Sequence, residues 1–453
     1  MSISRFIIVS PIAAMPSITI SFFTFIIFFF FFFLATVSHA ANHPGPARET
    51  IEIIIGGGSN SPPSPSTDCP PPPPPPCPPP LSPFESKRIE LVYPVIQNLK
   101  RRIRSDPLGV TNTWVGPDIC HEYKGFLCAI VPDYKVKALA GVNFNGFNLA
   151  GPDLSLHGFL DQLPDVTLFH ANSNQFTGTV PGTLANLRYL FELDLSNNKL
   201  YGEFPVEVLG ATKLTFLDLR FNSFSGAVPP RVFNLDLDVL FINNNGLMQT
   251  LPDEIGATPA MFLTLANNKF TGKIPRSIGK ASRTLLEVLL LNNRLSGCLP
   301  CEIGLLGRAR VFDVSCNWLT GPIPHSFGCL AHMEVLNLAQ NQLYGPVPET
   351  ICQLAHLANL SLSYNYFTQV GPICMKLIER KVLDVRMNCI LGLPMQRSKA
   401  QCEAFFSKPN NCPDPKSFKW VPCRPNSEEQ SDRRLTAQGA SLRSFEALVR
   451  HRL

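Results

Sequence analysis

The sequence lacks the motifs that mark most enzymes. It has no Gly-x-Ser-x-Gly turn, no phosphate-binding loop, no His-Glu-x-x-His pair and no kinase signature, and each of these is a common catalytic arrangement. Its nine histidines are scattered without metal-ligand spacing. The formal net charge of +5 is mild for 453 residues and gives no reason to expect nucleic acid as a partner. We therefore expect no enzymatic activity, no cofactor and no metal.

What the sequence does contain is a regularly repeated asparagine. The asparagines recur every 23 to 25 residues within the frame Leu-x-x-Leu-x-Leu-x-x-Asn-x-Leu-x-Gly-x-x-Pro. A unit of this length cannot bury its apolar side chains alone, so its copies must stack into a solenoid. The pattern predicts a leucine-rich repeat: an α/β solenoid of about 10 to 11 coils, between residues 136 and 395, with short parallel strands on its concave face. The repeated asparagines are Asn174, Asn198, Asn222, Asn245, Asn268, Asn293, Asn317, Asn341, Asn365 and Asn388.

Each repeated position has a physical role. The strand leucines point inward with a period of two, and the buried asparagine amide needs hydrogen bonds to neighbouring backbone. Glycine permits the turn that follows, and proline fixes φ where the chain crosses to the convex side. Gln249 and Gln369 replace this glycine in two coils. A degenerate first coil is expected at residues 139–151, with Phe147 at the asparagine position, and an incomplete last coil at residues 385–392.

The amino-terminal segment predicts export. Arg5 precedes an apolar run, residues 18–37, that ends in small residues near Ala40. This order is typical of a signal peptide, here residues 1–40, although the long apolar run leaves an uncleaved membrane anchor as the alternative. Fourteen cysteines also favour an oxidising compartment. We expect a secreted protein.

Residues 41–84 are predicted to form a disordered, proline-rich linker. Seven consecutive prolines separate Cys69 from Cys77. An extended polyproline helix would hold these cysteines about 25 Å apart, too far for a disulfide between them. They either pair elsewhere or remain as free thiols in a stiff spacer.

Residues 85–135 are predicted to cap the solenoid with a helix and a disulfide. Apolar residues recur on one face of a helix between Glu85 and Ile103. Cys120 and Cys128 are the expected disulfide. Lys100, Arg101, Arg102 and Arg104 form a basic cluster near the end of the helix. We interpret it as a solvated helix face, with contact to acidic cell-wall polysaccharide as the alternative.

The other end of the solenoid is also predicted to carry a disulfide cap, residues 396–423. Cys389, Cys402, Cys412 and Cys423 crowd this region beside Phe405, Phe406 and Trp420, and four cysteines allow three pairings. Cys352 and Cys374 occupy similar positions in adjacent coils and could also bridge. Cys298, Cys301, Cys316 and Cys329 stay unassigned, because a Cys-x-x-Cys pair inside a secreted repeat gives little support for metal or redox chemistry. Residues 424–453 are polar and are expected to be a disordered tail.

Several cap motifs resemble those of plant leucine-rich repeat extensins. The similar segments include Trp114-Val115-Gly116-x-Asp118-x-Cys120, Gly297-Cys298-Leu299-Pro300 and Cys402-x-x-Phe405-Phe406-x-x-Pro409-x-x-Cys412, and the resemblance covers about residues 85–423. It implies an apoplastic protein that binds small, basic, cysteine-rich signalling peptides of the rapid alkalinization factor type, often as a homodimer. Members of the family carry a long Ser-Pro-rich extensin tail, whereas this sequence continues for only 30 residues after Cys423. The expectation is therefore a relative that lacks the extensin region.

The concave face is the candidate binding surface. Outward positions of the frame bring together acids and exposed apolar side chains, which could bind a basic peptide. The alternative is that these apolar side chains only pack against one another. An inhibitor of wall-degrading enzymes, similar to polygalacturonase inhibitors, or a structural wall protein is the competing function. Asn359-Leu360-Ser361 is a possible glycosylation site. The candidate ligand-binding residues are Glu192, Asp194, Asp218, Arg220, Phe221, Phe241, Leu289 and Leu291.

Overall fold

The computed structural model describes residues 82–409, 412 and 417–423. The predicted signal peptide, most of the linker with Cys69 and Cys77, and the predicted tail lie outside the described residues. Within the described part, no helix has the length and apolar character needed to cross a bilayer.

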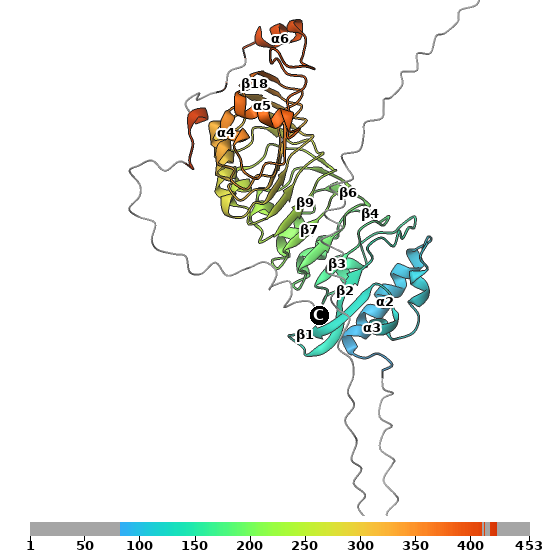
Figure 1. Cartoon of the computed structure of the whole chain (residues 1–453). Helices are drawn as coiled ribbons and strands as arrows, with labels where there is room; N and C mark the ends of the chain where they lie inside the picture. The colour runs from blue at the N-terminus through green and yellow to red at the C-terminus, as the bar shows by residue number, and fades with distance from the viewer. Residues whose placement is uncertain (1–81, 410–411, 413–416, 424–453) are drawn as a thin grey trace, which may run out of the picture. The chain divides into compact units, whose positions relative to one another are not determined.

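A sheet of twelve strands runs along the whole described repeat region (Figure 1). Each coil adds one short strand, and each strand pairs in parallel with the strand of the next coil, as Leu193 does with Leu217. This arrangement confirms the predicted solenoid. The strands, in spatial order, are β1 (Phe126–Val131), β2 (Val136–Asn143), β3 (Leu168–His170), β5 (Glu192–Asp194), β7 (Phe216–Asp218), β9 (Val239–Phe241), β11 (Phe262–Thr264), β13 (Glu287–Leu289), β15 (Val311–Asp313), β17 (Val335–Asn337), β19 (Asn359–Ser361) and β21 (Leu383–Asp384).

The repeated asparagines form a ladder inside the solenoid. Asn293 is typical: its Nδ2 donates to the carbonyls of Leu265 and Leu290, both at 3.1 Å. Its Oδ1 accepts a hydrogen bond from the Phe270 N–H at 3.0 Å. The side chain thus bonds to backbone groups of its own coil and of the preceding coil, and Asn293 is only 7% exposed. The prediction that the repeated amides turn inward and bond to backbone is confirmed.

The residue before each ladder asparagine adopts a left-handed conformation. From Ser173 to Met387 these ten residues have φ between 51° and 57°, a region that non-glycine residues occupy at some energetic cost. The turn directs the asparagine inward and the preceding side chain outward, beside the concave sheet. Phe221 and Cys316 occupy this position.

Two smaller parallel sheets follow the asparagine turns, and Gln249 lies where one ends and the other begins. Gln249 occupies the usual glycine position, and only an isolated bridge between Thr250 and Thr271 joins the two sheets. The Gln249 amide instead donates to the Val228 carbonyl at 2.8 Å. The strands are β4 (Thr177–Gly178), β6 (Lys199–Glu203), β8 (Ser223–Gly226) and β10 (Gly246–Leu247) in one sheet, and β12 (Thr271–Gly272), β14 (Arg294–Cys298), β16 (Trp318–Gly321), β18 (Gln342–Pro346) and β20 (Tyr366–Gln369) in the other.

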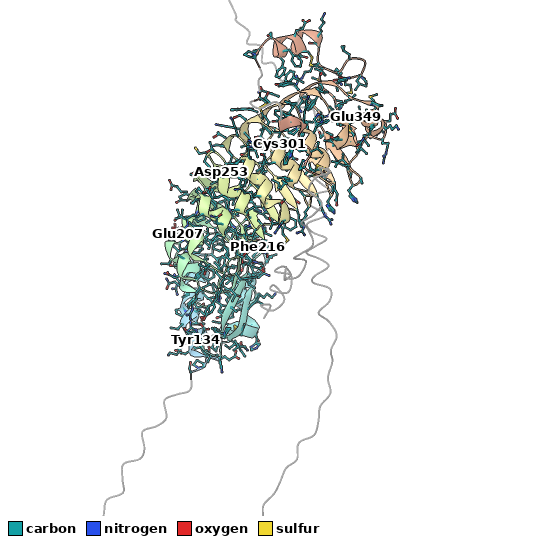
Figure 2. The ribbon with its side chains drawn as sticks, turned by 90° about the vertical axis from the view of Figure 1, so that its left-hand side faces the viewer. Tyr134, Glu207, Phe216, Asp253, Cys301 and Glu349 are labelled. Atoms are coloured by element: carbon teal, nitrogen blue, oxygen red, sulfur yellow. A yellow bond between two sulfur atoms is a disulfide. The ribbon has the colours of Figure 1, made fainter. Side chains whose placement is uncertain are left out.

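Short helical turns complete most coils on the side away from the concave sheet. Each one from η3 to α4 begins directly after a proline of the repeat, because proline fixes φ where the turn starts. Figure 2 shows Glu207, Asp253, Cys301 and Glu349 following one another along this side. These turns are η2 (Leu160–Gln162), η3 (Gly182–Asn186), η4 (Val206–Gly210), η5 (Pro230–Asn234), η6 (Asp253–Ala257), η7 (Arg276–Arg283), η8 (Cys301–Leu305), η9 (His325–Cys329), α4 (Glu349–Cys352) and α5 (Pro372–Glu379).

The amino-terminal cap contains the predicted helix, here α2 (Lys87–Arg102), with η1 (Val110–Thr113) and α3 (Ile119–Glu122). Ile89, Val92, Ile96 and Leu99 bury one face of α2. The predicted pair Cys120–Cys128 is a disulfide. The antiparallel hairpin β1–β2 was not predicted, and through it the cap continues directly into the first coil.

The interpretation of the basic cluster as a solvated face is wrong for Arg102. Its Nη1 donates to the carbonyls of Ser155 and His157 at 3.0 and 3.1 Å. Burial lowers the pKa of its guanidinium. Arg102 therefore ties α2 to the first coil.

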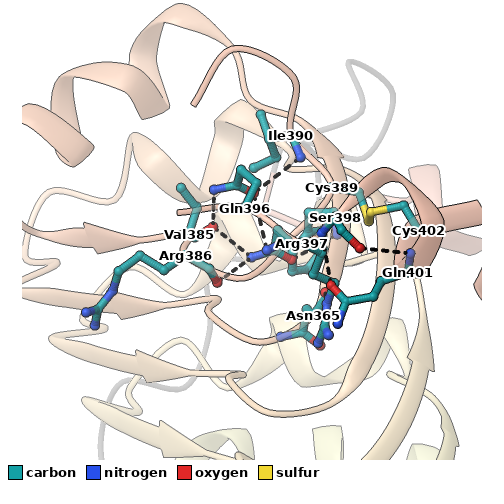
Figure 3. Close-up of a disulfide and its surroundings, with 12 residues drawn as sticks. Asn365, Val385, Arg386, Cys389, Ile390, Gln396, Arg397, Ser398, Gln401 and Cys402 are labelled. Carbon is teal, nitrogen blue, oxygen red and sulfur yellow. Dashed lines mark hydrogen bonds between the residues drawn. A yellow bond between two sulfur atoms is a disulfide. The ribbon is translucent and has the colours of Figure 1, made fainter. Parts of the chain in front are cut away.

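The carboxyl-terminal cap is held by polar contacts around the Cys389–Cys402 disulfide (Figure 3). Gln396 donates to the Val385 carbonyl at 3.1 Å and accepts from the N–H groups of Asn388 and Ile390. These bonds close the last, incomplete coil. The chain then enters α6 (Lys399–Phe406), which begins with a reciprocal capping pair of Ser398 and Gln401. The remaining element of this end is η10 (Ser417–Lys419).

The pairing expected among the four carboxyl-terminal cysteines is wrong for two of them. Cys412 bonds to Cys298 and Cys423 bonds to Cys329, 114 and 94 residues earlier in the chain. The segment after α6 folds back along the solenoid, so it reaches coils that lie far away in sequence. We call this segment, described at residues 407–409, 412 and 417–423, the return segment. Cys352 and Cys374 of adjacent coils form a disulfide.

The aromatic anchors of this end also differ in part from expectation. Phe405 stacks on Tyr366 with a centroid distance of 3.6 Å. Trp420, however, is 43% exposed, while Phe418 is buried. Phe418 therefore takes the anchoring role that the sequence suggested for Trp420.

Candidate functional site

The concave surface consists of the first and third residue of each short strand, because the second residue points into the core. In β5, for example, Leu193 is buried, while Glu192 and Asp194 are partly exposed. In β9 the corresponding outward residues are Val239 and Phe241. The outward residues differ in chemistry along the solenoid and divide the surface into three parts.

The amino-terminal part, β3 to β5, is polar. His170 Nε2 lies 2.8 Å from the Glu192 carboxylate in the next strand. Asp194 accepts hydrogen bonds from the N–H and Oγ of Ser196 at 2.9 and 2.6 Å. Both acids remain partly exposed. This part of the surface therefore offers negative charge to a partner.

Asp218 does not belong to the accessible surface. It is fully buried, and Arg220 Nε lies 2.9 Å from its Oδ2. Burial, together with the nearby Asp194 carboxylate, holds the pKa of Asp218 well above its ordinary range. The Arg220 guanidinium also lies 5.0 Å from the ring centre of Phe241. Asp218 therefore orients Arg220 over Phe241, and its predicted direct role in ligand binding is wrong.

The central part, β7 to β17, is a strip of half-buried apolar side chains. Phe216 and Phe241 are in contact, with ring centroids 6.4 Å apart. Leu289 lies in β13, and Leu291 follows that strand, both partly exposed. Phe221 lies apart from this strip, in the left-handed turn beside the sheet, and is 46% exposed. We call the following set the apolar strip: Phe216, Val239, Phe241, Phe262, Leu289, Leu291, Val311 and Val335.

The carboxyl-terminal part of the surface, formed by the third residues of β15 and β17 together with β19 and β21, is polar again, and most of its groups bond to one another. Asn337 donates to Asp313 at 2.9 Å. Arg386 pairs with Asp384 through two contacts of 2.9 and 2.8 Å. Asn359 is exposed on β19, between these two groups. The internal pairing leaves little uncompensated charge at this end.

The sequence prediction missed the first residue of most concave strands. Phe216, Val239, Phe262 and Val311 contribute to the apolar strip, yet only Glu192 had been assigned from this position. The strand pairing shows that these residues align across neighbouring coils. The sequence does indicate these positions, because each of these four residues comes directly before the inward-pointing residue of its strand.

Three further features of the described residues bear on chemistry outside the concave face. They contain no group of three or more His, Cys, Asp or Glu side chains placed to hold a metal ion. Cys298 is occupied by its disulfide, and Cys301 is a buried free thiol. A surface hollow of about 530 Å³ lies among η6, η7 and η8. Its Arg276 is paired with Glu302 at 2.6 Å, and Asp253 and Lys280 also line it.

Asp238, which precedes β9 at the edge of the concave sheet, should make stability depend on pH. Burial, and secondarily Asp236, raises its pKa to about 6. Because the native state then binds the proton more tightly than the unfolded chain, this contribution is greatest below about pH 4 and is lost as pH rises through 6. We expect Asp238→Asn to stabilise the protein at pH 7 by about 1 kcal/mol, a figure reduced for partial solvent exposure. Denaturant unfolding at pH 4 and pH 7 checks this, and a gain of equal size at both values would contradict it.

The comparisons with known proteins agree with this architecture. Residues 213–235 and 308–330 match the Leucine Rich Repeat family model. The chain is 42% identical over 340 residues to leucine-rich repeat extensin-like protein 7 of Arabidopsis thaliana, covering 75% of this chain and 76% of the relative. It is 45% identical over 334 residues to leucine-rich repeat extensin-like protein 6 of the same plant, covering 73% and 70%. The solved structure of a plant ice-binding protein is similar in fold alone, with 22% identity, a TM-score of 0.55, and 69% and 98% coverage.

Proposed function

Because the chain belongs to the leucine-rich repeat extensin-like family, we propose that it is an extracellular binding protein of the plant cell wall or apoplast. We infer that its ligand is a small, basic, cysteine-rich signalling peptide of the rapid alkalinization factor type. The ligand binds on the concave face. The resulting complex would act in signalling that controls growth or cell-wall integrity.

The main support for this proposal is the composition of the concave face. Its apolar strip, with Phe216 and Phe241 in contact, adjoins the carboxylates of Glu192 and Asp194. Aromatic side chains at the centre of a surface supply much of the binding energy in protein complexes. Nearby acids favour and orient a basic partner. A small basic peptide with apolar side chains therefore fits both properties of the surface.

The disulfides support the extracellular part of the proposal. The described residues contain five of them, and disulfides persist in oxidising compartments. A cleaved signal peptide at residues 1–40 and a proline-rich linker before the cap are consistent with the same destination. These two segments remain proposals from sequence.

We also propose that Asn359 carries an N-linked glycan. Its side chain is exposed on β19, at the concave surface, and the sequon continues with Leu360 and Ser361. A glycan there would cover the carboxyl-terminal part of the concave face, where charges are already paired. The ligand would then bind over β3 to β15, where the acids and the apolar strip lie.

Replacing Phe216 and Phe241 by alanine is expected to weaken peptide binding by about 30-fold, since each substitution removes an aromatic contact worth about 1 kcal/mol. The wild type and the double variant would be used to capture peptides from apoplastic fluid, and the captured peptides identified by mass spectrometry. Affinities for the identified peptide would then be measured by calorimetry.

Tyr201→Ala is the matched control for this experiment. Tyr201 is also an aromatic residue, 53% exposed, but it lies in β6 outside the concave sheet. It should capture the same peptide as the wild type. Equal binding by the double variant would remove the site assignment. Capture of a polygalacturonase instead of a peptide would favour the wall-enzyme inhibitor.

A further inference from the structure

Glu287 interrupts the apolar strip with a carboxylate. It is the first residue of β13, and it pairs with Phe262 of β11 on one side and Val311 of β15 on the other. Leu289 is the other outward residue of the same strand. Glu287 is half-buried, and burial raises the pKa of its carboxyl group. An acid at this position is surrounded by apolar side chains rather than by other polar groups.

The other acids of the concave strands have partners within the chain. Glu192 contacts His170, Asp218 contacts Arg220, and Asp384 contacts Arg386. Asp194 and Asp313 accept hydrogen bonds from serine residues two positions later. In the described part of the chain, no hydrogen bond or ion pair reaches the carboxylate of Glu287. A half-buried carboxylate without a partner destabilises the free protein, so its presence requires another explanation.

We propose that the carboxylate of Glu287 binds one lysine or arginine side chain of the peptide ligand. This inference rests on the proposed function and adds a specific chemical requirement to it. The cation would form an ion pair with the carboxylate of Glu287. Its aliphatic stem would pack on Val311, and its charge could also interact with the ring of Phe262.

The apolar surroundings make this contact selective. Once a ligand covers the strip and excludes water, the attraction between the two charges becomes stronger than in solvent. A ligand without a cation at this point would leave the carboxylate buried and unpaired, which disfavours binding. The peptide should therefore present a lysine or arginine flanked by apolar side chains. General basicity alone would not satisfy the site.

A displayed library of random peptides, each closed by one disulfide, provides the test because it assumes no natural ligand. The wild type and Glu287→Gln would be used in parallel selections. We expect the wild type to enrich peptides in which lysine or arginine lies beside apolar residues. Glu287→Gln should still enrich apolar residues but should lose the enrichment of lysine and arginine. It should bind the peptides selected by the wild type at least about tenfold more weakly.

Glu203→Gln is the matched control, because Glu203 is an exposed glutamate of β6, outside the concave sheet. It should select the same peptides as the wild type. Thermal unfolding supplies a second measurement: Glu287→Gln should unfold at a higher temperature than the wild type, since it removes an unpaired, half-buried charge. A purely structural role for Glu287 predicts the opposite shift.

The outcomes separate the two proposals. If the wild type and Glu287→Gln enrich the same lysine- or arginine-containing peptides, the role of Glu287 is wrong and the proposed function stands. A lower unfolding temperature for Glu287→Gln would likewise contradict the role given to this residue. If the wild type enriches no peptide at all, both the proposed function and this inference fail.

Discussion

Replacing Asn293 by alanine is expected to lower the free energy of unfolding by about 3 to 5 kcal/mol. The substitution removes the hydrogen bonds that its amide makes with Leu265, Leu290 and Phe270. Each buried backbone group left without a partner costs about 1 to 3 kcal/mol. Because these groups belong to neighbouring turns, the loss loosens the stack as well as one turn. Denaturant unfolding followed by circular dichroism measures the effect.

The neighbouring residue supplies the control for this prediction. Asn292 is exposed and adopts a φ of 51°, which glycine also accepts readily. Asn292→Gly should therefore change the free energy of unfolding by no more than about 0.5 kcal/mol. If Asn293→Ala were as stable as Asn292→Gly, the amide ladder would not be a main source of stability.

Replacing Gly321 by alanine is expected to prevent the Cys298–Cys412 disulfide. Gly321 lies in β16 with a φ of 90°, and a Cβ added there would overlap with Sγ of Cys412. The protein should lose about 4 kcal/mol from the missing cross-link, which joins residues 114 positions apart. A further cost of about 1 kcal/mol arises because alanine disfavours this backbone conformation. Thermal unfolding and titration of free thiols in denaturant measure both consequences.

Gly345→Ala separates the lost disulfide from backbone strain. Gly345 of β18 has a φ of 86°, but a Cβ there would meet only Pro322, at 3.8 Å. This variant should therefore lose only the backbone contribution and keep the wild-type number of free thiols. Gly321→Ala should show two additional free thiols. Identical thiol counts and unfolding temperatures for the two variants would contradict the close packing of Cys412 against Gly321.

The sequence predicted the repeated parts of the fold well because the same residue types form the core and the turn of every coil. An inward leucine, a buried asparagine and a turn glycine recur at fixed spacing, so the register of every coil follows from its neighbours. Even the irregular coil at Gln249 was visible in sequence, and the lateral sheets are interrupted there. Cys120–Cys128 was also predictable, because both cysteines lie close together within one cap.

The contacts that do not repeat could not be predicted in the same way. Nothing in the spacing of Cys412 and Cys423 indicates that the chain reverses after α6 and reaches Cys298 and Cys329. The candidate site was predicted only in part, for a related reason. The frame correctly places Asp218 in a concave strand, but it does not show that Arg220 and the neighbouring coils bury its carboxylate.

The return segment also changes how this solenoid can come apart. Stacked repeats usually fray from their ends, since a terminal coil has only one neighbour. Here the return segment, which follows the last coil, is joined by disulfides to β14 and η9, so the terminal coils cannot separate from the stack one at a time. The coils from β14 onward must open together as one cooperative block. The interruption of the lateral sheets at Gln249, between β10 and β12, lies one coil before this block and is the nearest weak boundary between it and the amino-terminal coils.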